Sequence, residues 1–111
     1  MDRAILHKTI YRVVQAMVEG KYEELESARV QATDIRRVVE AYGRCLSMPP
    51  VDAFGSLLNV IEITGTQPSQ WYAGVNLWTL EDGWSDLTLE LTLTDSAGEL
   101  YPVQVDDLRV L

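Results

Sequence analysis

The chain has little cysteine, little positive charge and no long apolar run. Cys45 is the single cysteine among 111 residues, so no disulfide framework can form within the chain and a reducing cytoplasm is the expected compartment. No apolar run approaches the ~20 residues of a membrane span. The opening Met1-Asp2-Arg3 lacks the basic and then apolar layout of a signal peptide. The sequence therefore predicts a soluble, cytoplasmic protein with no membrane partner.

Positive charge is scarce overall and almost absent from the second half. Nine Lys and Arg stand against seventeen Asp and Glu, which gives a net charge of −8. Such a charge repels phosphate backbones, so we expect no nucleic-acid partner. Residues 1–50 carry eight cations and seven acids, whereas residues 51–111 carry ten acids and one cation, Arg109. This asymmetry indicates either two surfaces of different charge or two halves that attract each other.

The first part of the chain has helical periodicity. From Arg3 to Glu19 apolar side chains recur every three or four residues, which predicts an amphipathic helix that Gly20 ends. A short turn is expected over Tyr22–Leu25. A second helix is expected to begin with Thr33 as its N-cap and to end at Gly43.

After Pro50 the apolar period changes from 3.6 to 2, which predicts strands. Four are expected, at Phe54–Ile63, Trp71–Leu80, Leu87–Thr94 and Tyr101–Val105, the last extended by Val110-Leu111. Pro102 cannot donate to a ladder, so the last strand is expected at an edge. Short connections indicate an antiparallel meander, one face of which the helices must cover. The predicted fold class is α+β, a single domain over residues 1–111 in which two or three helices (residues 3–43) pack on a four-stranded sheet (residues 54–111).

The pairing within each hairpin decides which side chains face outward. A loop at Ser96–Gly98 with Gly98 in the left-handed region places Leu93 opposite Tyr101 and Leu91 opposite Val103. An odd-length loop around Asp82-Gly83-Trp84 brings the leucines of the third strand onto the same face as the apolar residues of the second. The pairs expected there are Leu77 with Leu89, Val75 with Leu91 and Ala73 with Leu93.

The opposite sheet face then carries aromatic and polar side chains. Tyr72, Asn76 and Trp78 are expected on it together with Glu90 and three threonines. Either another part of the chain covers these aromatics, or they form a recognition surface for a protein partner or for a second copy in a homodimer.

The tip of the central hairpin is the local carboxylate cluster that could bind a hard cation or meet a basic partner. Glu81, Asp82 and Asp86 lie within six residues, around Trp84. The spacing is not that of an EF-hand loop, so the cluster indicates either turn chemistry or a surface for a basic partner. Trp84 either folds back on the domain or contacts something else.

Basic residues of the second helix region offer the opposite charge. Arg36, Arg37 and Arg44 either form a solvated helix face or reach the acidic sheet, of the same molecule or of a second copy.

Residues suited to catalysis or metal binding are few, and we predict no cofactor, no metal and no catalytic residue. His7, the only histidine, lies at the edge of the first helix's apolar stripe, as a boundary residue does. Cys45 has no neighbouring histidine, and such a thiol behaves as a small apolar group. If the space between helices and sheet is open, Tyr22, Tyr42 and Trp71 would line a pocket there, although all three are typical core residues.

Two resemblances to known families add an expectation of fold. Val14–Leu25 resembles the first helix, and Asp86–Leu111 the closing strands, of the ketosteroid-isomerase-like and cystatin-like α+β rolls. This resemblance implies helices packed into a curved sheet. It implies no activity, because such rolls include isomerases, dehydratases, hydrolases and non-catalytic binders. No stretch matches the carboxylate base and the oxyanion hole of the steroid isomerases.

A narrower resemblance lies in Leu77–Leu89. Its Leu-Trp-Thr, Glu-Asp-Gly and Ser-Asp-Leu-Thr-Leu elements look like the signature of a small bacterial family of unknown function.

The sequence favours a non-catalytic, small acidic protein of the immunity type, which holds a protein partner through its acidic loop and aromatic sheet face. The alternative is a small-molecule binder or an enzyme with a pocket between helices and sheet. A purely structural homodimer subunit is the third hypothesis.

Overall fold

The first helix forms where the sequence predicts it. In the computed structural model, which describes residues 1–111, α1 (Arg3–Val18) begins after Asp2, whose carboxylate accepts hydrogen bonds from the backbone N–H groups of Ala4 (2.9 Å) and Ile5 (3.2 Å). Gly20 follows the helix with φ 72°. That left-handed conformation is strained for other residues, so the predicted glycine stop is confirmed.

The second helix, α2 (Ala32–Tyr42), begins earlier than expected. The prediction that Thr33 is its N-cap is wrong, because Gln31 holds that position. The backbone N–H of Gln31 donates to the Asp34 carboxylate at 3.0 Å, so the acidic residue of the first turn supplies the cap. Gly43, with φ 73°, ends the helix as predicted.

Four short elements connect the main ones: η1 (Tyr22–Leu25), β1 (Leu46–Ser47), α3 (Val51–Phe54) and η2 (Gly55–Leu57). The expectation of a strand from Phe54 is wrong for its first four residues, which are helical. The Phe54 ring packs edge-on against His7 (centroids 6.0 Å apart) and Tyr11 (5.7 Å), and this contact with α1 holds the chain away from the sheet.

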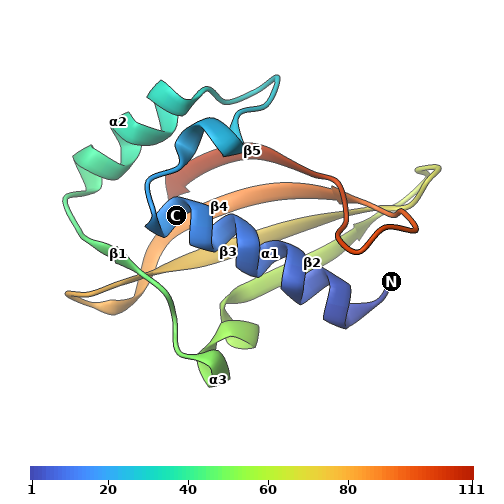
Figure 1. The fold of residues 1–111 in the computed structure, drawn as a ribbon, viewed down its shortest axis with the longest axis horizontal. Coiled ribbons are helices and arrows are strands. Elements are labelled where there is room, and N and C mark those ends of the chain that lie inside the picture. The colour runs from blue at the N-terminus through green and yellow to red at the C-terminus, as the bar shows by residue number, and fades with distance from the viewer.

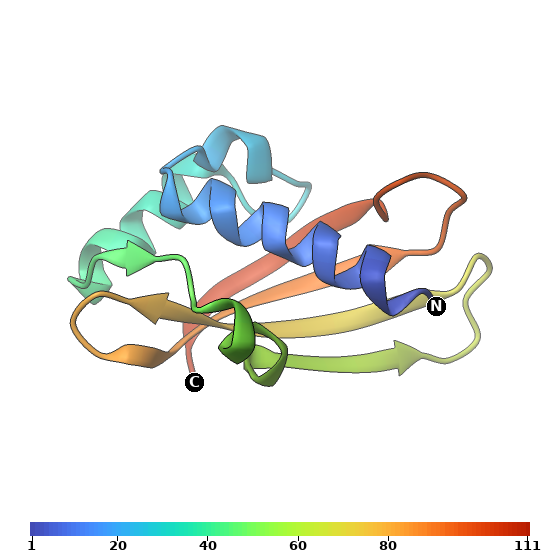
Figure 2. The ribbon, with the colours of Figure 1, turned by 60° about the horizontal axis from the view of Figure 1, so that its bottom comes forward.

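The sheet is an antiparallel meander of β2 (Leu58–Ile63), β3 (Gln70–Thr79), β4 (Gly83–Thr94) and β5 (Val103–Val110). β5 lies at one edge, as the position of Pro102 predicts. The two-residue β1, which has no periodic signal, pairs with the far end of β3. Figures 1 and 2 show α1, η1 and α2 together on one face of a twisted, curved sheet. The α+β fold class is therefore confirmed.

The central hairpin has the odd loop that was predicted, but centred two positions earlier. Thr79 pairs with Gly83, which leaves a loop of three residues, Leu80–Asp82. An irregularity that adds two residues to β4 between the pairs Trp78–Trp84 and Asn76–Thr88 then sets Val75 opposite Leu89 rather than Leu91. The shift is an even number of residues, so every side chain stays on its predicted face.

The predicted residue pairs of the last hairpin are wrong, and the packing of Tyr101 explains why. Leu93 pairs with Val103 rather than with Tyr101, and Gly98 is not in the left-handed region. Tyr101 packs on α1 instead: its N–H donates to the Thr9 hydroxyl (3.0 Å), and its own hydroxyl accepts from the Asp2 N–H (2.8 Å). The connection accordingly runs over residues 95–102.

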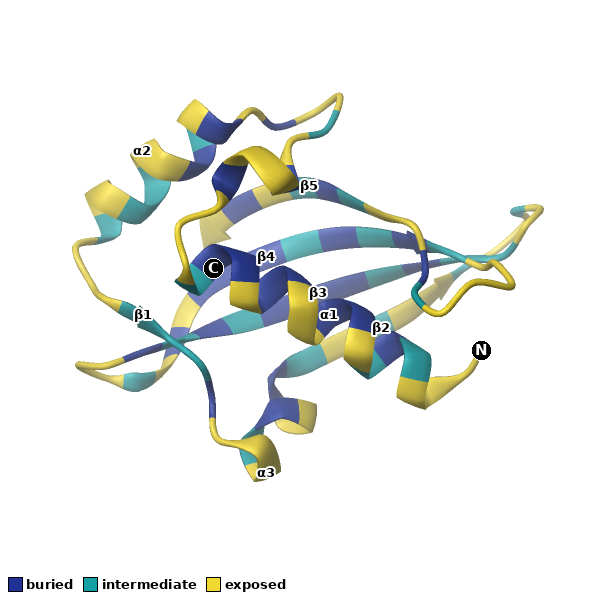
Figure 3. Ribbon diagram, in the orientation of Figure 1, coloured by how far each residue is buried: buried dark blue, intermediate teal, exposed yellow.

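The core lies between the two layers and has 23 buried residues. Alternation along β4 buries Leu87, Leu89, Leu91 and Leu93 in this core. Figure 3 shows buried residues recurring along α1 and along β3 and β4 beneath it. The sheet face that is turned away from the helices lies outside this core.

Candidate interaction surface

The sheet face turned away from α1 and α2, which we call the outer face, is partly polar and uncovered. Residues paired across strands point to the same side, so the ladder places Tyr72 beside Thr92, Asn76 beside Thr88, and Trp78 beside Trp84 on this face. The amide of Asn76 donates to the Thr88 hydroxyl at 3.2 Å. The predicted members Tyr72, Asn76, Trp78 and Glu90 thus lie together on one surface.

Tyr72 is held in one orientation by a charged network. Its hydroxyl donates to the Glu90 carboxylate at 2.8 Å, and the other Glu90 oxygen lies 2.7 Å from Nε of Arg109. Glu90 is only 13% exposed, so this ion pair is better shielded from solvent than an ordinary surface pair. Burial and the hydrogen bond to Glu90 raise the pKa of Tyr72 above its ordinary 10.0. The ring lies over Gly74, where an added Cβ would be 2.9 Å from the Tyr72 hydroxyl.

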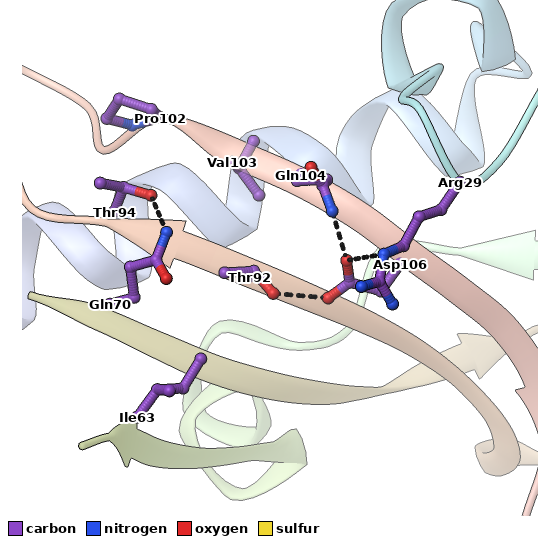
Figure 4. A pocket seen from close by; sticks show the side chains of 9 residues that line it. All are labelled: Arg29, Ile63, Gln70, Thr92, Thr94, Pro102, Val103, Gln104 and Asp106. Carbon is purple, nitrogen blue, oxygen red and sulfur yellow. Dashed lines mark hydrogen bonds and ion pairs between the residues drawn. The ribbon is translucent and has the colours of Figure 1, made fainter. Parts of the chain in front are cut away.

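A polar hollow of about 420 Å³ lies at the end of the outer face nearer β2's last residue (Figure 4). Asp106 is its centre: one carboxylate oxygen accepts from Thr92 (2.6 Å), and the other from the Gln104 amide (2.8 Å), with Arg29 at 3.9 Å. The amide of Gln70 donates to the Thr94 hydroxyl at 3.2 Å. The lining side chains therefore satisfy one another, and Arg29 offsets the charge of Asp106.

The other end of the outer face is aromatic. Trp78 and Trp84 are direct cross-strand partners, and the Trp78 ring covers Gly83. Trp84 is 56% exposed, and Leu80 in the adjoining loop is 73% exposed. The Trp84 ring therefore does not fold back into the core and is free to contact another molecule.

All three carboxylates at the hairpin tip bond to the last residue of α2 or to the segment that follows it. We call these contacts the clasp. The Tyr42 hydroxyl donates to Asp86 (2.7 Å), Nε of Arg44 donates to Asp82 (2.9 Å), and the Cys45 N–H donates to Glu81 (3.0 Å). The hydrogen bond to Asp86, followed by burial, raises the pKa of Tyr42, and Asp82 raises that of Arg44. The tip is thereby fixed to the helical layer.

Arg44 is part of the clasp, whereas the two basic residues of α2, Arg36 and Arg37, are not. Arg44 reaches the acidic hairpin of its own molecule, whereas Arg36 pairs with Glu23 (3.6 Å) and Arg37 with Asp34 (3.3 Å). Sequence reasoning gave a contact with the acidic sheet of the same molecule as one alternative for these arginines, but it did not single out Arg44 or Asp82, because nothing local links positions 38 residues apart.

The aromatics expected around an interlayer pocket are core or clasp residues. Tyr22 and Trp71 are buried in the core, and Tyr42 bonds to Asp86. No hollow lies between the helices and the sheet around Tyr22 and Tyr42; Trp71 lines only a hollow near the N-terminus. Sequence reasoning missed a hollow of about 470 Å³ beside α1, formed by His7, Tyr11 and Phe54 with their neighbours.

The residues also offer little for metal chemistry. No three His, Cys, Asp or Glu side chains come together in a way that would hold an ion. None of the helices has both the length and the apolar character that crossing a membrane requires.

Fold and surface together define a small α+β domain with one covered and one uncovered sheet face. Residues 14–111 match the domain of unknown function DUF7668, and the chain belongs to that family. The expectation of an uncharacterised family is thus confirmed. No curated protein and no solved structure matches the chain, so the likeness to cystatin-like and ketosteroid-isomerase-like rolls stays a prediction.

Proposed function

We propose that this protein is a non-catalytic, cytoplasmic binding domain that holds a basic protein partner on its outer face. The observation that carries this proposal is Trp84: an indole more than half exposed, next to Trp78, on a hairpin that the clasp holds in place. Tryptophan anchors in a polar surround are the residues that contribute most to protein interfaces.

Preorganisation supports the same surface. The outer face is ordered before any partner arrives, because Tyr72 is bonded to Glu90 and the tip is bonded to α2. Side chains that are already fixed lose less conformational entropy on binding. The net charge of −8 favours a partner of opposite sign. An immunity-type role in a bacterium, in which the partner is a basic toxin or nuclease, is the specific form of this proposal.

Two substitutions test it. The partner is captured from cells of the source organism, identified and purified, and its affinity for the chain is then measured by titration calorimetry. Trp84→Ala is expected to weaken binding about 30-fold, the loss of a ~2 kcal/mol anchor. Tyr11→Ala, which removes a partly exposed aromatic from α1 on the other layer, is expected to change affinity less than 2-fold. Equal affinities of Trp84→Ala and wild type would rule out the tip as the anchor.

A further inference from the structure

β2 is an open sheet edge without the usual protection. It pairs with β3 alone, and its one backbone hydrogen bond outside that ladder is at its start, where the Leu58 N–H donates to the Gly55 carbonyl. The register from Leu58 to Ile63 is unbroken, with no bulge, no proline, no glycine and no cation. Ile61 on the outer face is 54% exposed. Such a strand presents a row of free N–H and C=O groups that another strand can pair with.

The opposite edge of the sheet, β5, is protected against pairing with another strand. β5 has a bulge at Asp106, follows Pro102 and carries Asp107 and Arg109. The hydroxyl of Ser27, in the connection before α2, donates to the Val105 carbonyl at 2.6 Å. Bulges, prolines, charges and covering loops are the devices that prevent strand pairing at an edge. β5 has all four, whereas β2 has only the single charge of Glu62.

We infer that β2 pairs with β2 of a second copy, antiparallel about a two-fold axis, so that two sheets become one. Sheet faces must match, which leaves registers centred on a residue rather than between residues. Centring on Glu62 would oppose two like charges, and centring on Val60 would set the exposed Ile61 opposite Asn59. Centring on Ile61 sets this exposed apolar side chain opposite itself.

In the Ile61 register the central contact is apolar. Ile61 faces its own copy and covers exposed apolar surface, while Asn59 faces Ile63, and Val60 faces Glu62. Arg3 lines the same hollow as Val60 and Glu62, and neither Arg3 nor Glu62 has an ion-pair partner within the chain. The two-fold axis brings Glu62 of the second copy toward the Val60 side of that hollow, where Arg3 lies.

The distribution of charge permits this approach despite the net charge of −8. Apart from Glu90 on β4, which pairs with Arg109, the acids of the other strands lie on β5 and at the β3–β4 tip, and Glu62 is the only charged residue of β2. Beyond about 8 Å, physiological salt screens most of the remaining repulsion. The inference does not rest on the proposed function, because the outer face stays free on both copies.

The mass in solution gives the first test. By light scattering at several hundred micromolar, the full chain is expected at twice the 12.5 kDa of one chain. Ile61→Lys opposes two ammonium groups across the axis and is expected to return the mass to 12.5 kDa. Val110→Lys is the matched control, because Val110 is equally exposed at 54% but lies on the protected edge; it should remain dimeric. A monomeric wild type, or a dimer that survives Ile61→Lys, would overturn the inference.

Cross-linking gives the second test, which is independent of the first and reports the register. In a Cys45→Ser background, cysteines at position 61 would face each other with Cα atoms roughly 4.5 to 5.5 Å apart, within disulfide range. Cysteines at position 59 would be offset by four residues, roughly 13 Å. Ile61→Cys is expected to form a covalent dimer on mild oxidation at least tenfold faster than Asn59→Cys. Equal rates, or a faster Asn59→Cys, would contradict the pairing.

Discussion

At the scale of the residue, Tyr72 and Gly74 show how the outer face is fixed. The tyrosine ring occupies the space above a residue with no side chain, and this position lets its hydroxyl reach Glu90 at 2.8 Å. The sequence predicts the face on which Tyr72 lies, because alternation along a strand is a local rule. It does not predict the direction of the ring or its acceptor, because both depend on what β4 and β5 place beside it.

Gly74→Ala is expected to displace the ring. The new Cβ would lie 2.9 Å from the Tyr72 hydroxyl, so the bond to Glu90 would break and the free energy of unfolding would fall by about 1–2 kcal/mol. Denaturant unfolding at pH 7 measures this loss. Gly98→Ala, where a Cβ meets nothing closer than 3.5 Å, is the control and should be neutral.

The same variant has a predicted pH dependence. The pKa of Tyr72 is raised above 10.0 in the folded protein, so its stabilising contribution is complete below pH 10 and is lost as pH rises through the folded pKa. The stability difference between wild type and Gly74→Ala should therefore shrink above pH 10. A difference that stays constant to pH 11 would show that the hydroxyl of Tyr72 is not involved.

At the scale of the element, the clasp joins the end of α2 to the β3–β4 hairpin. The sequence predicts both elements from their apolar patterns and from the glycines that mark the helix end and the turn, Gly43 and Gly83. It does not predict β1, because two residues carry no periodicity, or the register of the last hairpin, because the packing of Tyr101 on α1 overrides the local turn signal. Long-range contacts thus decide what local rules leave open.

Tyr42→Phe tests the clasp. It removes the 2.7 Å hydrogen bond to Asp86 and is expected to lower the free energy of unfolding by about 1 kcal/mol, with faster hydrogen exchange in residues 79–86. Tyr11→Phe removes a hydroxyl that has no partner within the chain and is the matched control. If both variants unfold alike, the clasp contributes nothing measurable.

At the scale of the whole molecule, the two halves of unlike charge contact each other. Arg29 lies 3.9 Å from Asp106, and Arg44 lies 2.9 Å from Asp82. Both pairs join the basic first half to the acidic second half, which is one of the two interpretations that the charge count allows. The remaining negative charge is available to steer a basic partner.

Neutralising the tip should slow that association. Glu81→Gln with Asp82→Asn keeps oxygen acceptors for Cys45 and Arg44 but removes two charges, so association in stopped-flow should slow several-fold at low salt. The effect should vanish near 1 M salt, where the Debye length is about 3 Å. Glu99→Gln, in the exposed connection between β4 and β5 at the other end of the hairpin strand, is the control. A slowing that is equal at all salt concentrations would exclude electrostatic steering.

The central claim is that the outer face and the hairpin tip, rather than the helical layer, hold the partner. Site-specific photo-crosslinking tests it most directly, with the photoreactive side chain placed at Trp84 on the tip or at the exposed Gln15 on α1. Cross-linking to the purified partner is expected from position 84 and not from position 15. Cross-linking from position 15 alone would place the partner on the helices and contradict the account.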